Sequence, residues 1–278
     1  MVFFRLIVSF AAISGFLLVF ITSANAAANQ KVSEKATLRI ITLSPHLTEI
    51  VYALGKGDQV VAVSDYSDYP TDAASLPSVA SYEGANIAEI IRLQPTHILV
   101  WRGGNKDADI EKLSQLDIIL HESSIDSVEE LMSDVLKIGD VLNAQKEASA
   151  LVESMQLARD AIASRHENKS VNAVYYLSTQ PLIGLGNDKW LNSLLNLCGI
   201  SNIYASSKSA YPQLQMSHII RSQPALLIAA TNEIAKTWQP HQAVLKAKIV
   251  SANPDALHRF TPRAIDEMSV VCDKVYAD

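Results

Sequence analysis

Short β-branched and apolar runs alternate with helical patterns along this chain, first over residues 39–121 and again over residues 173–276. The expected strands lie at 39–43, 60–64, 97–101, 118–121, 173–177, 225–230 and 248–251. The expected helices lie near 46–54, 86–93, 106–116, 189–198, 215–222 and 262–276. Strands separated by helices predict parallel pairing, with the helices covering the faces of the sheet. The sequence therefore predicts an α/β protein of two similar lobes with parallel-rich sheets.

The two halves share a signal at the end of a helix. Leu93-Gln94-Pro95 precedes one expected strand, and a second Gln-Pro pair at 223–224 precedes another. Proline disfavours helical backbone in the residue before it, so each helix should end there and the chain should approach the next strand in an extended conformation. A Gln-Pro pair between a helix and a strand in both halves supports the assignment of two related lobes.

One continuous helix is expected between the lobes, over residues 143–166. Its apolar side chains recur every three or four residues and form one stripe, which consists of Ala144, Ala148, Leu151, Met155, Ala158 and Ile162. Such a helix would extend roughly 36 Å and could run along both lobes as a rigid strut. A dimer seam is the alternative, but the stripe is rich in alanine and short for a coiled coil. We therefore predict a monomer with an N-terminal lobe at 27–142, this linker helix, and a C-terminal lobe at 167–278.

The first 26 residues have the pattern of an export signal. Arg5 precedes an apolar stretch over 6–21, and the small-x-small pattern at 24–26 supplies a cleavage site before Ala27. An uncleaved membrane anchor is the alternative, although the stretch is shorter than the ~20 residues that span a bilayer. No cysteine lies near the cleavage site to carry a lipid. The sequence therefore predicts a signal peptide at 1–26 and a protein that is soluble in the periplasm after cleavage.

The charge balance narrows the class of partner. The chain carries 23 Lys and Arg against 29 Asp and Glu, a formal net charge of −6. Its basic residues form no cluster, whereas nucleic-acid phosphates require Lys and Arg gathered on one face. Nucleic acid is therefore excluded as a partner.

The chain contains two cysteines, Cys198 and Cys272. An even count in an exported chain favours a disulfide over two free thiols. A bond that closes so long a loop should stabilise the second half by roughly 4 kcal/mol on the chain-entropy model. A metal site would need more ligands than these two residues supply.

Aromatic residues stand where two expected strands end. Tyr66 follows the apolar run at 60–63, and Trp101 ends the run at 98–100, while Tyr82 lies in a polar turn. In open α/β sheets, ligands bind beyond the carboxyl ends of the strands. Aromatic rings offer flat apolar area at little conformational cost. We therefore predict that these three rings contact a flat ligand.

Other residues offer candidate polar contacts. Gly103 either lets a ligand approach the main chain or forms an ordinary turn. Arg102 either donates to ligand carbonyls or caps a sheet edge. Asp255 and Arg259 follow the strand near 248–251 and form either a solvated ion pair or a polar clamp. We predict a clamp, because a second lobe that faces the first would bring this pair to the aromatic loops.

Metal and catalytic signatures are absent from the sequence. The seven histidines show no His-x-His or Glu-x-x-His spacing. His46, in a strand-to-helix loop, is the candidate axial ligand for a haem or cobalt centre. The chain has no G-x-S-x-G elbow and no phosphate loop. The sequence therefore predicts a binding protein without a resident cofactor, rather than an enzyme.

Several motifs resemble those of a known family. They are R-I-I-T-L-S-P-H-L-T-E-I, V-S-D-Y-S-D-Y-P, I-L-V-W-R-G-G-N and Y-P-Q-L, together with the two cysteines. Over nearly all of residues 38–276 the chain resembles the periplasmic cobalamin-binding proteins of ABC importers, which are substrate-binding proteins with a helical backbone. The resemblance implies two α/β lobes joined by one rigid helix, a corrinoid in the cleft between them, and delivery to an inner-membrane ABC permease.

The resemblance also implies roles for particular residues. Tyr66 and Trp101 fall on ring-contacting positions, Tyr82 replaces a Trp, and Asp255 and Arg259 fall on second-lobe contacts. Cobalamin or a related corrinoid is therefore the expected ligand. A haem or ferric-siderophore binding protein of the same architecture is the first alternative, and an envelope enzyme of unknown class is the second.

Docking on the permease is expected to differ from the family pattern. The family docks through an acidic residue at each lobe tip, and the matching positions here are Ala88 and Ser217. Glu89 and His218 lie beside them. Either the docking charges have moved to neighbouring positions or the partner differs, and we expect contacts through Glu89, Ser217 and His218.

Overall fold

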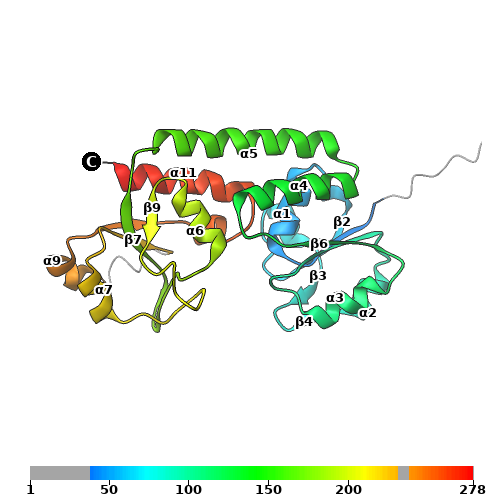
Figure 1. Ribbon diagram of the computed structural model, residues 1–278. Helices are drawn as coiled ribbons and strands as arrows, with labels where there is room; N and C mark the ends of the chain where they lie inside the picture. Colours follow the sequence, from blue (N-terminus) through cyan, green and yellow to red (C-terminus); the bar gives the residue numbers. More distant parts are fainter. Residues whose placement is uncertain (1–37, 231–237, 278) are drawn as a thin grey trace, which may run out of the picture. The chain divides into compact units, whose positions relative to one another are not determined.

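Figure 1 shows the protein as a computed structural model, which describes residues 38–230 and 238–277. The first lobe contains the strands β1 Ile40–Thr42, β2 Val60–Ser64, β3 Ser78–Ser81, β4 Gly84–Ala85, β5 His97–Trp101 and β6 Ile119–Ser123. Its helices are α1 Pro45–Ala53, α2 Ile87–Arg92, α3 Asp107–Ser114 and α4 Val128–Val141. The strands form one six-stranded sheet in the order β4-β3-β2-β1-β5-β6. Its neighbours pair in parallel, apart from the antiparallel pair of β3 and β4.

The second lobe repeats this plan around a five-stranded sheet. Its strands are β7 Val171–Thr179, β8 Leu182–Gly184, β9 Ile200–Asn202, β10 Leu226–Ala229 and β11 Lys248–Ser251. Its helices are α6 Lys189–Asn196, α7 Met216–Ser222, α9 Gln242–Leu245, α10 Pro254–Leu257 and α11 Pro262–Tyr276. The order is β11-β10-β7-β8, with β9 also paired to β7, and only β7 and β8 run antiparallel among these described pairs. The predicted class, two α/β lobes with parallel-rich sheets, is confirmed.

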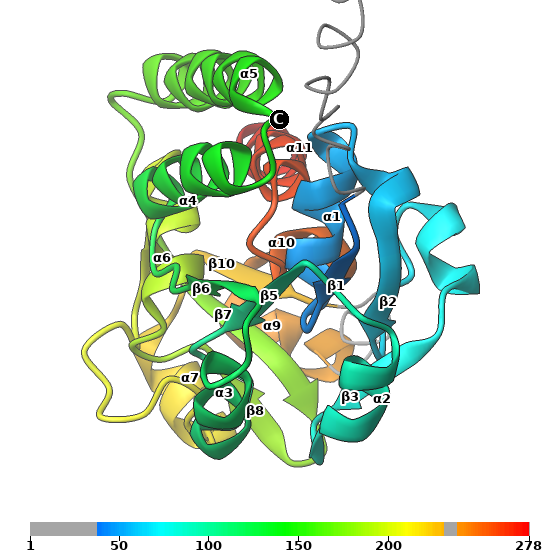
Figure 2. The ribbon, with the colours of Figure 1, turned by 90° about the vertical axis from the view of Figure 1, so that its right-hand side faces the viewer.

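A single long helix, α5 Gln145–Arg165, joins the two lobes. It lies along α4 of the first lobe and α11 of the second, as Figures 1 and 2 both show. The predicted stripe faces this support: Ala148, Met155 and Ile162 are buried, and Leu151 is partly buried. The linker helix is thus present, slightly shorter than the sequence predicted, while the limits of the two lobes stay a prediction.

Successive side chains of a central strand pack into different hydrophobic layers on the two faces of the sheet. In β1, Ile40 packs into the core shared with α4, α5 and α11, whereas Ile41 faces the layer under α2 and α3. Successive strand residues point to opposite faces, so a strand buried on both sides reads as an unbroken apolar run. The core that contains Ile40 also contains Tyr175 and Ile228 of the second lobe. The lobes therefore share one hydrophobic core as well as one helix.

The Gln-Pro signals do end helices, but their backbone differs from the sequence-based expectation. Gln94 and Gln223 have φ of 48° and 43°, which is the left-handed region rather than the extended one. A left-handed residue at the end of a helix turns the chain sharply away from the helix axis. The expected extended approach to the strand is therefore wrong at these two residues.

The predicted disulfide is present. Cys198 follows α6 and Cys272 lies on α11, with Cα atoms 6.0 Å apart and both side chains fully buried. The predicted signal peptide at 1–26 lies outside the described residues. In the described ranges, no helix combines the length and the apolar character that crossing a bilayer requires.

Candidate functional site

The three rings predicted from the sequence lie together on the first lobe, and we call Tyr66, Tyr82 and Trp101 the aromatic wall. They line one pocket of about 200 Å³. Its other lining residues are Leu43, Ser44, Pro45, Ser64, Asp65, Ser81, Gly104 and Asn105. Tyr66 and Tyr82 are 79% and 86% exposed, which is unusual for large rings. The pocket lies beyond the carboxyl ends of β1, β2, β3 and β5, where open α/β sheets bind ligands.

Trp101 folds back over the glycines that follow it. A Cβ atom added to Gly103 would lie 2.5 Å from the Trp101 indole nitrogen, and one added to Gly104 would also collide with the indole. The loop is held by Asn105, whose side chain accepts from the Trp101 amide at 2.7 Å and donates to the Leu43 carbonyl at 2.8 Å. The glycines therefore make room for the tryptophan ring. Approach of a ligand to the exposed main chain of Gly103 stays a prediction.

Arg102 is engaged at the edge of the first sheet. Its guanidinium forms an ion pair of 2.5 Å with Glu122 on the neighbouring edge strand β6 and a longer one of 3.4 Å with Asp107. This is the sheet-edge arrangement that the sequence left open beside a ligand contact. A contact between Arg102 and a ligand stays a prediction.

Tyr66 has a strained backbone. Its φ is 63°, in the left-handed region, which a bulky residue rarely adopts without support from its surroundings. Hydroxyl groups on both sides provide that support: Ser67 accepts from Thr48 at 3.1 Å and pairs with Ser64 at 3.2 Å, all buried. The Asp65 amide donates to the Ala80 carbonyl at 2.8 Å. The strain presents the Tyr66 ring outward, into the pocket.

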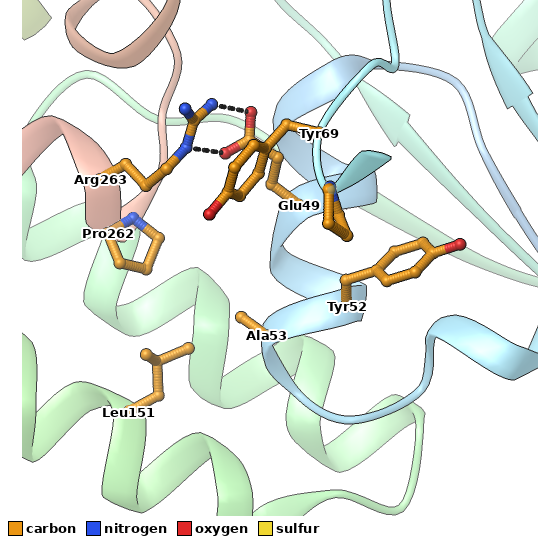
Figure 3. Close-up of a pocket in the computed structure, with 8 residues that line it drawn as sticks. Glu49, Tyr52, Ala53, Tyr69, Leu151, Pro262 and Arg263 are labelled. Carbon is orange, nitrogen blue, oxygen red and sulfur yellow. Dashed lines mark hydrogen bonds and ion pairs between the residues drawn. The ribbon is translucent and has the colours of Figure 1, made fainter. Parts of the chain in front are cut away.

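Four charged residues tie the lobes together beside this wall, and we call Glu49, Asp68, Arg259 and Arg263 the joint. Glu49, on α1 and only 4% exposed, accepts from Arg259 at 2.9 Å and from Arg263 at 2.6 and 2.8 Å. Figure 3 shows the two bonds from Arg263, with the Tyr69 ring against its guanidinium. Arg259 also pairs with Asp68 at 2.8 Å, and this hydrogen bond lowers the pKa of the Asp68 carboxyl.

His46 lies between the lobes rather than in the pocket. Its ring packs edge-on against Trp101 of the first lobe and Phe260 of the second, with centroids 5.4 and 5.0 Å away. Nδ1 bonds to the Ser44 hydroxyl at 2.5 Å, and burial lowers the pKa of His46 to about 3. The ring is 3% exposed and therefore neutral at physiological pH. This packing explains His46 as part of the core, and the axial-ligand hypothesis draws no support from it.

The ion pair between Asp255 and Arg259, which the sequence left open beside a ligand clamp, is not formed among the described residues. Arg259 turns to Glu49 and Asp68 of the first lobe, and no ion pair joins it to Asp255 among the described residues. Asp255 is exposed at the start of α10, where its amide is capped by the Asn253 side chain at 3.0 Å. The two residues therefore differ: Arg259 is held within the protein, and the Asp255 carboxylate faces solvent.

A second pocket, of about 320 Å³, lies on the side of the joint toward α5. Glu49, Arg263, Tyr69 and Leu151 are among the lining residues drawn in Figure 3. The lining is mostly apolar, and its two charged residues pair with each other. Nothing in this lining selects a ligand, so the aromatic wall is the better candidate site.

The expected docking positions lie at the surface of the two lobes. Ala88, Ser217 and His218 are exposed, and His218 bonds to the Tyr204 hydroxyl at 2.9 Å. The Glu89 carboxylate pairs with Arg92 at 2.5 Å, and this contact lowers its pKa. A role in docking stays a prediction for all of them, and Glu89 would meet a partner as one half of an ion pair.

Sequence reasoning missed Glu49, Phe260 and Arg263. One signal for Glu49 was available: it is the one acidic residue of α1, and the structure buries every residue of that helix from His46 to Val51. A carboxylate in such a place requires an opposite charge. The partners could not be identified, because both arginines are more than two hundred residues away along the chain. No group of three or more His, Cys, Asp or Glu is placed to hold a metal ion within the described ranges.

Comparison with known proteins gives a consistent result. The sequence profile of a family described as "Periplasmic binding protein" matches residues 40–254. A vitamin B12-binding protein of Vibrio cholerae serotype O1 is 34% identical over 241 residues, covering 84% of this chain and 87% of the relative. One from Yersinia pestis is 29% identical over 247 residues, covering 87% of each.

Solved structures agree with this grouping. The crystal structure of the periplasmic vitamin B12 binding protein BtuF of Vibrio cholerae has a TM-score of 0.77 at 35% identity, covering 85% of this chain and 96% of that chain. The periplasmic heme binding protein HutB of Vibrio cholerae has a TM-score of 0.75 at 21% identity, covering 87% and 100%. The second likeness shows the shared fold alone.

Proposed function

Because the chain belongs to the periplasmic binding protein family, we propose that it captures vitamin B12 or a related corrinoid at the aromatic wall and delivers it to an ABC permease. The recognition made from sequence motifs is confirmed at the level of the family. The family consists of binding proteins, and the proposed role involves no chemistry on the ligand.

The observation that carries this proposal is the exposure of the aromatic wall. Two tyrosine rings project into one pocket with Trp101, and no other side chain covers them among the described residues. If three rings each hid ~100 Å² of apolar surface on binding, they would contribute about 7 kcal/mol before the cost of association. A corrin ring is large and flat enough to cover all three, so the wall suits such a ligand.

Polar contacts complete the proposed site. The exposed Asp255 carboxylate is the second-lobe group that we assign to the amide side chains of the corrin. In the first lobe, Arg102 keeps a half-exposed guanidinium beside the wall. Arg259 is already paired with Glu49 and Asp68, so we propose that it supports the wall rather than contacts the ligand.

Titration calorimetry with cyanocobalamin tests this function. We expect a one-to-one complex, and we expect Trp101→Ala to weaken it by roughly 1 to 3 kcal/mol, as for a lost buried aromatic contact. Absence of binding at tens of micromolar would exclude the proposal. Haemin and a ferric siderophore serve as controls for the alternative ligands of this fold, and tighter binding of either than of cyanocobalamin would replace the corrinoid.

Membership of the same family supports a proposal for the partner and for the compartment. We propose a periplasmic protein that presents the loaded ligand to an inner-membrane permease through the surfaces around Glu89, Ser217 and His218. Transport assays with the candidate permease in vesicles would test this step. Ser217→Arg should reduce uptake without changing cyanocobalamin affinity, and unchanged uptake would move the docking surface elsewhere.

A further inference from the structure

The aromatic wall depends on a side chain that does not line it. Tyr66 is held in its left-handed conformation by hydroxyl groups of its own lobe and by one group of the other lobe, Arg259. The Arg259 Nη2 atom lies 2.8 Å from the Asp68 carboxylate and 3.4 Å from the Tyr66 carbonyl oxygen. One guanidinium therefore contacts the loop on both sides of Ser67, close to the strained residue.

Glu49 in turn fixes the position of Arg259. Its carboxylate accepts from the Arg259 Nη1 atom and, through both oxygens, from Arg263. Glu49 is buried, whereas the carboxylate of Asp68 is 62% exposed and holds its partner less firmly. Without the Glu49 charge, Arg259 would lose the contact that keeps it against the loop.

We propose that Glu49 is a positioning residue for the corrinoid site: through Arg259 it sets the backbone of Tyr66 and so the aromatic wall. This proposal rests on the proposed function, and it assigns a binding role to a residue outside the pocket. It also gives a role to two neighbouring residues of α1. Thr48 bonds to Ser67 within the first lobe, while Glu49 binds Arg259 of the second lobe.

The test uses Glu49→Gln, which keeps the shape of the side chain and removes its charge. Hydrogen–deuterium exchange of the ligand-free protein should show faster exchange over residues 64–70 than in the wild type. Glu122→Gln is the matched control, because Glu122 pairs with Arg102 at the far edge of the same sheet and does not touch this loop. Asp68→Asn, at the exposed end of the same contact, should give a smaller change in the same direction.

Cyanocobalamin affinity supplies the second readout. Glu49→Gln should weaken binding roughly tenfold in the wild-type background, as for a coupling of ordinary size. In a Tyr66→Ala background the same change should weaken binding by about twofold or less, because the group it positions is gone. A residue that served only global stability would cause the same loss in both backgrounds.

Two results would overturn the proposal. One is an unchanged exchange rate over residues 64–70 in both Glu49→Gln and Asp68→Asn. The other is an equal loss of affinity with and without the Tyr66 ring. If the wild type fails to bind cyanocobalamin, the proposed function fails, and the exchange experiment still decides whether Glu49 controls the loop.

Discussion

The joint and the aromatic wall lie side by side, yet they differ in how far the protein itself provides contacts for their side chains. In the joint, the Glu49 carboxylate accepts from two arginines, and Asp68 pairs with one of them. In the wall, Tyr66 and Tyr82 project into a pocket and are mostly exposed. Groups satisfied within the protein hold the structure, whereas rings left uncovered are available to a ligand. The difference separates residues that support the site from residues that form it.

Removal of the disulfide is expected to have the largest effect on stability. The double variant Cys198→Ala/Cys272→Ala should unfold about 4 kcal/mol more easily, because the bond closes a loop of 74 residues. Urea unfolding followed by circular dichroism measures this loss. Neither cysteine belongs to the aromatic wall or to the joint, so cyanocobalamin affinity below the transition should stay unchanged. A large loss of affinity would show that the wall is not independent of the second lobe's core.

Removal of the Glu49 charge from the joint should lower the free energy of unfolding somewhat less than loss of the disulfide does. Glu49→Gln leaves two partly buried arginines without their shared carboxylate, and we expect a loss of about 3 kcal/mol in the free energy of unfolding. Glu122→Gln, which breaks a more exposed pair, should cost less than about 1 kcal/mol. Equal costs for the two variants would contradict the distinction between the joint and an ordinary surface pair.

Acid should lower the stability of the fold through His46, which is buried between the lobes. Its pKa is lowered to about 3 by burial, so below its ordinary value of 6.5 the unfolded state binds a proton that the folded state does not. Stability from this group is therefore complete above pH 6.5 and falls toward pH 3, by up to about 1.4 kcal/mol per pH unit. His46→Phe should flatten this slope between pH 6.5 and 4 in urea unfolding.

Two other histidines affect the same experiment. Burial also lowers the pKa values of His97 and His258, so part of the acid dependence should remain in His46→Phe. His218→Gln, at an exposed position, is the control and should keep the wild-type slope. If both variants follow the wild-type profile, His46 is not the buried neutral group described here.

Relief of strain in the wall should give the smallest change in stability, with opposite signs for folding and binding. Glycine adopts φ near 63° freely, so Tyr66→Gly should stabilise the ligand-free protein by roughly 1 kcal/mol. It should also weaken cyanocobalamin binding, because a ring of the wall is lost. Tyr82→Ala, which removes a ring without a strained backbone, should weaken binding without the gain in stability. Calorimetry and thermal unfolding measure the two effects, and lower stability of Tyr66→Gly would contradict the assigned strain.

Most of the fold was accessible from the sequence, because long apolar runs and one helical stripe carry strong periodic signals. The main strands, the linker helix over α5 and the disulfide were predicted. The strands β3, β4, β8 and β9 were missed. They are about as short as β1, but they lack the longer β-branched and apolar run that marked β1 within residues 39–43. Helix α4 was also missed, although its amphipathic pattern is clear in retrospect.

In the site, too, the residues with a local sequence signal were predicted and those without one were missed. The rings of the wall were found because each follows a local signal, the end of a strand and a polar turn. The joint was not found, because its contacts connect residues such as Glu49 and Arg263 across 214 positions, and no local pattern specifies such a pair. For the same reason the sequence placed Arg259 with Asp255, four residues earlier in the chain, in a ligand clamp, and it gave no sign of the contacts between Arg259 and the first lobe.

A crystal structure of the complex with cyanocobalamin tests the central claim most directly. We expect the corrin ring to cover Tyr66, Tyr82 and Trp101 while Arg259 and Arg263 keep their bonds to Glu49. A corrinoid bound away from these rings, or an Arg259 that leaves Glu49 to contact the ligand, would contradict the division between wall and joint.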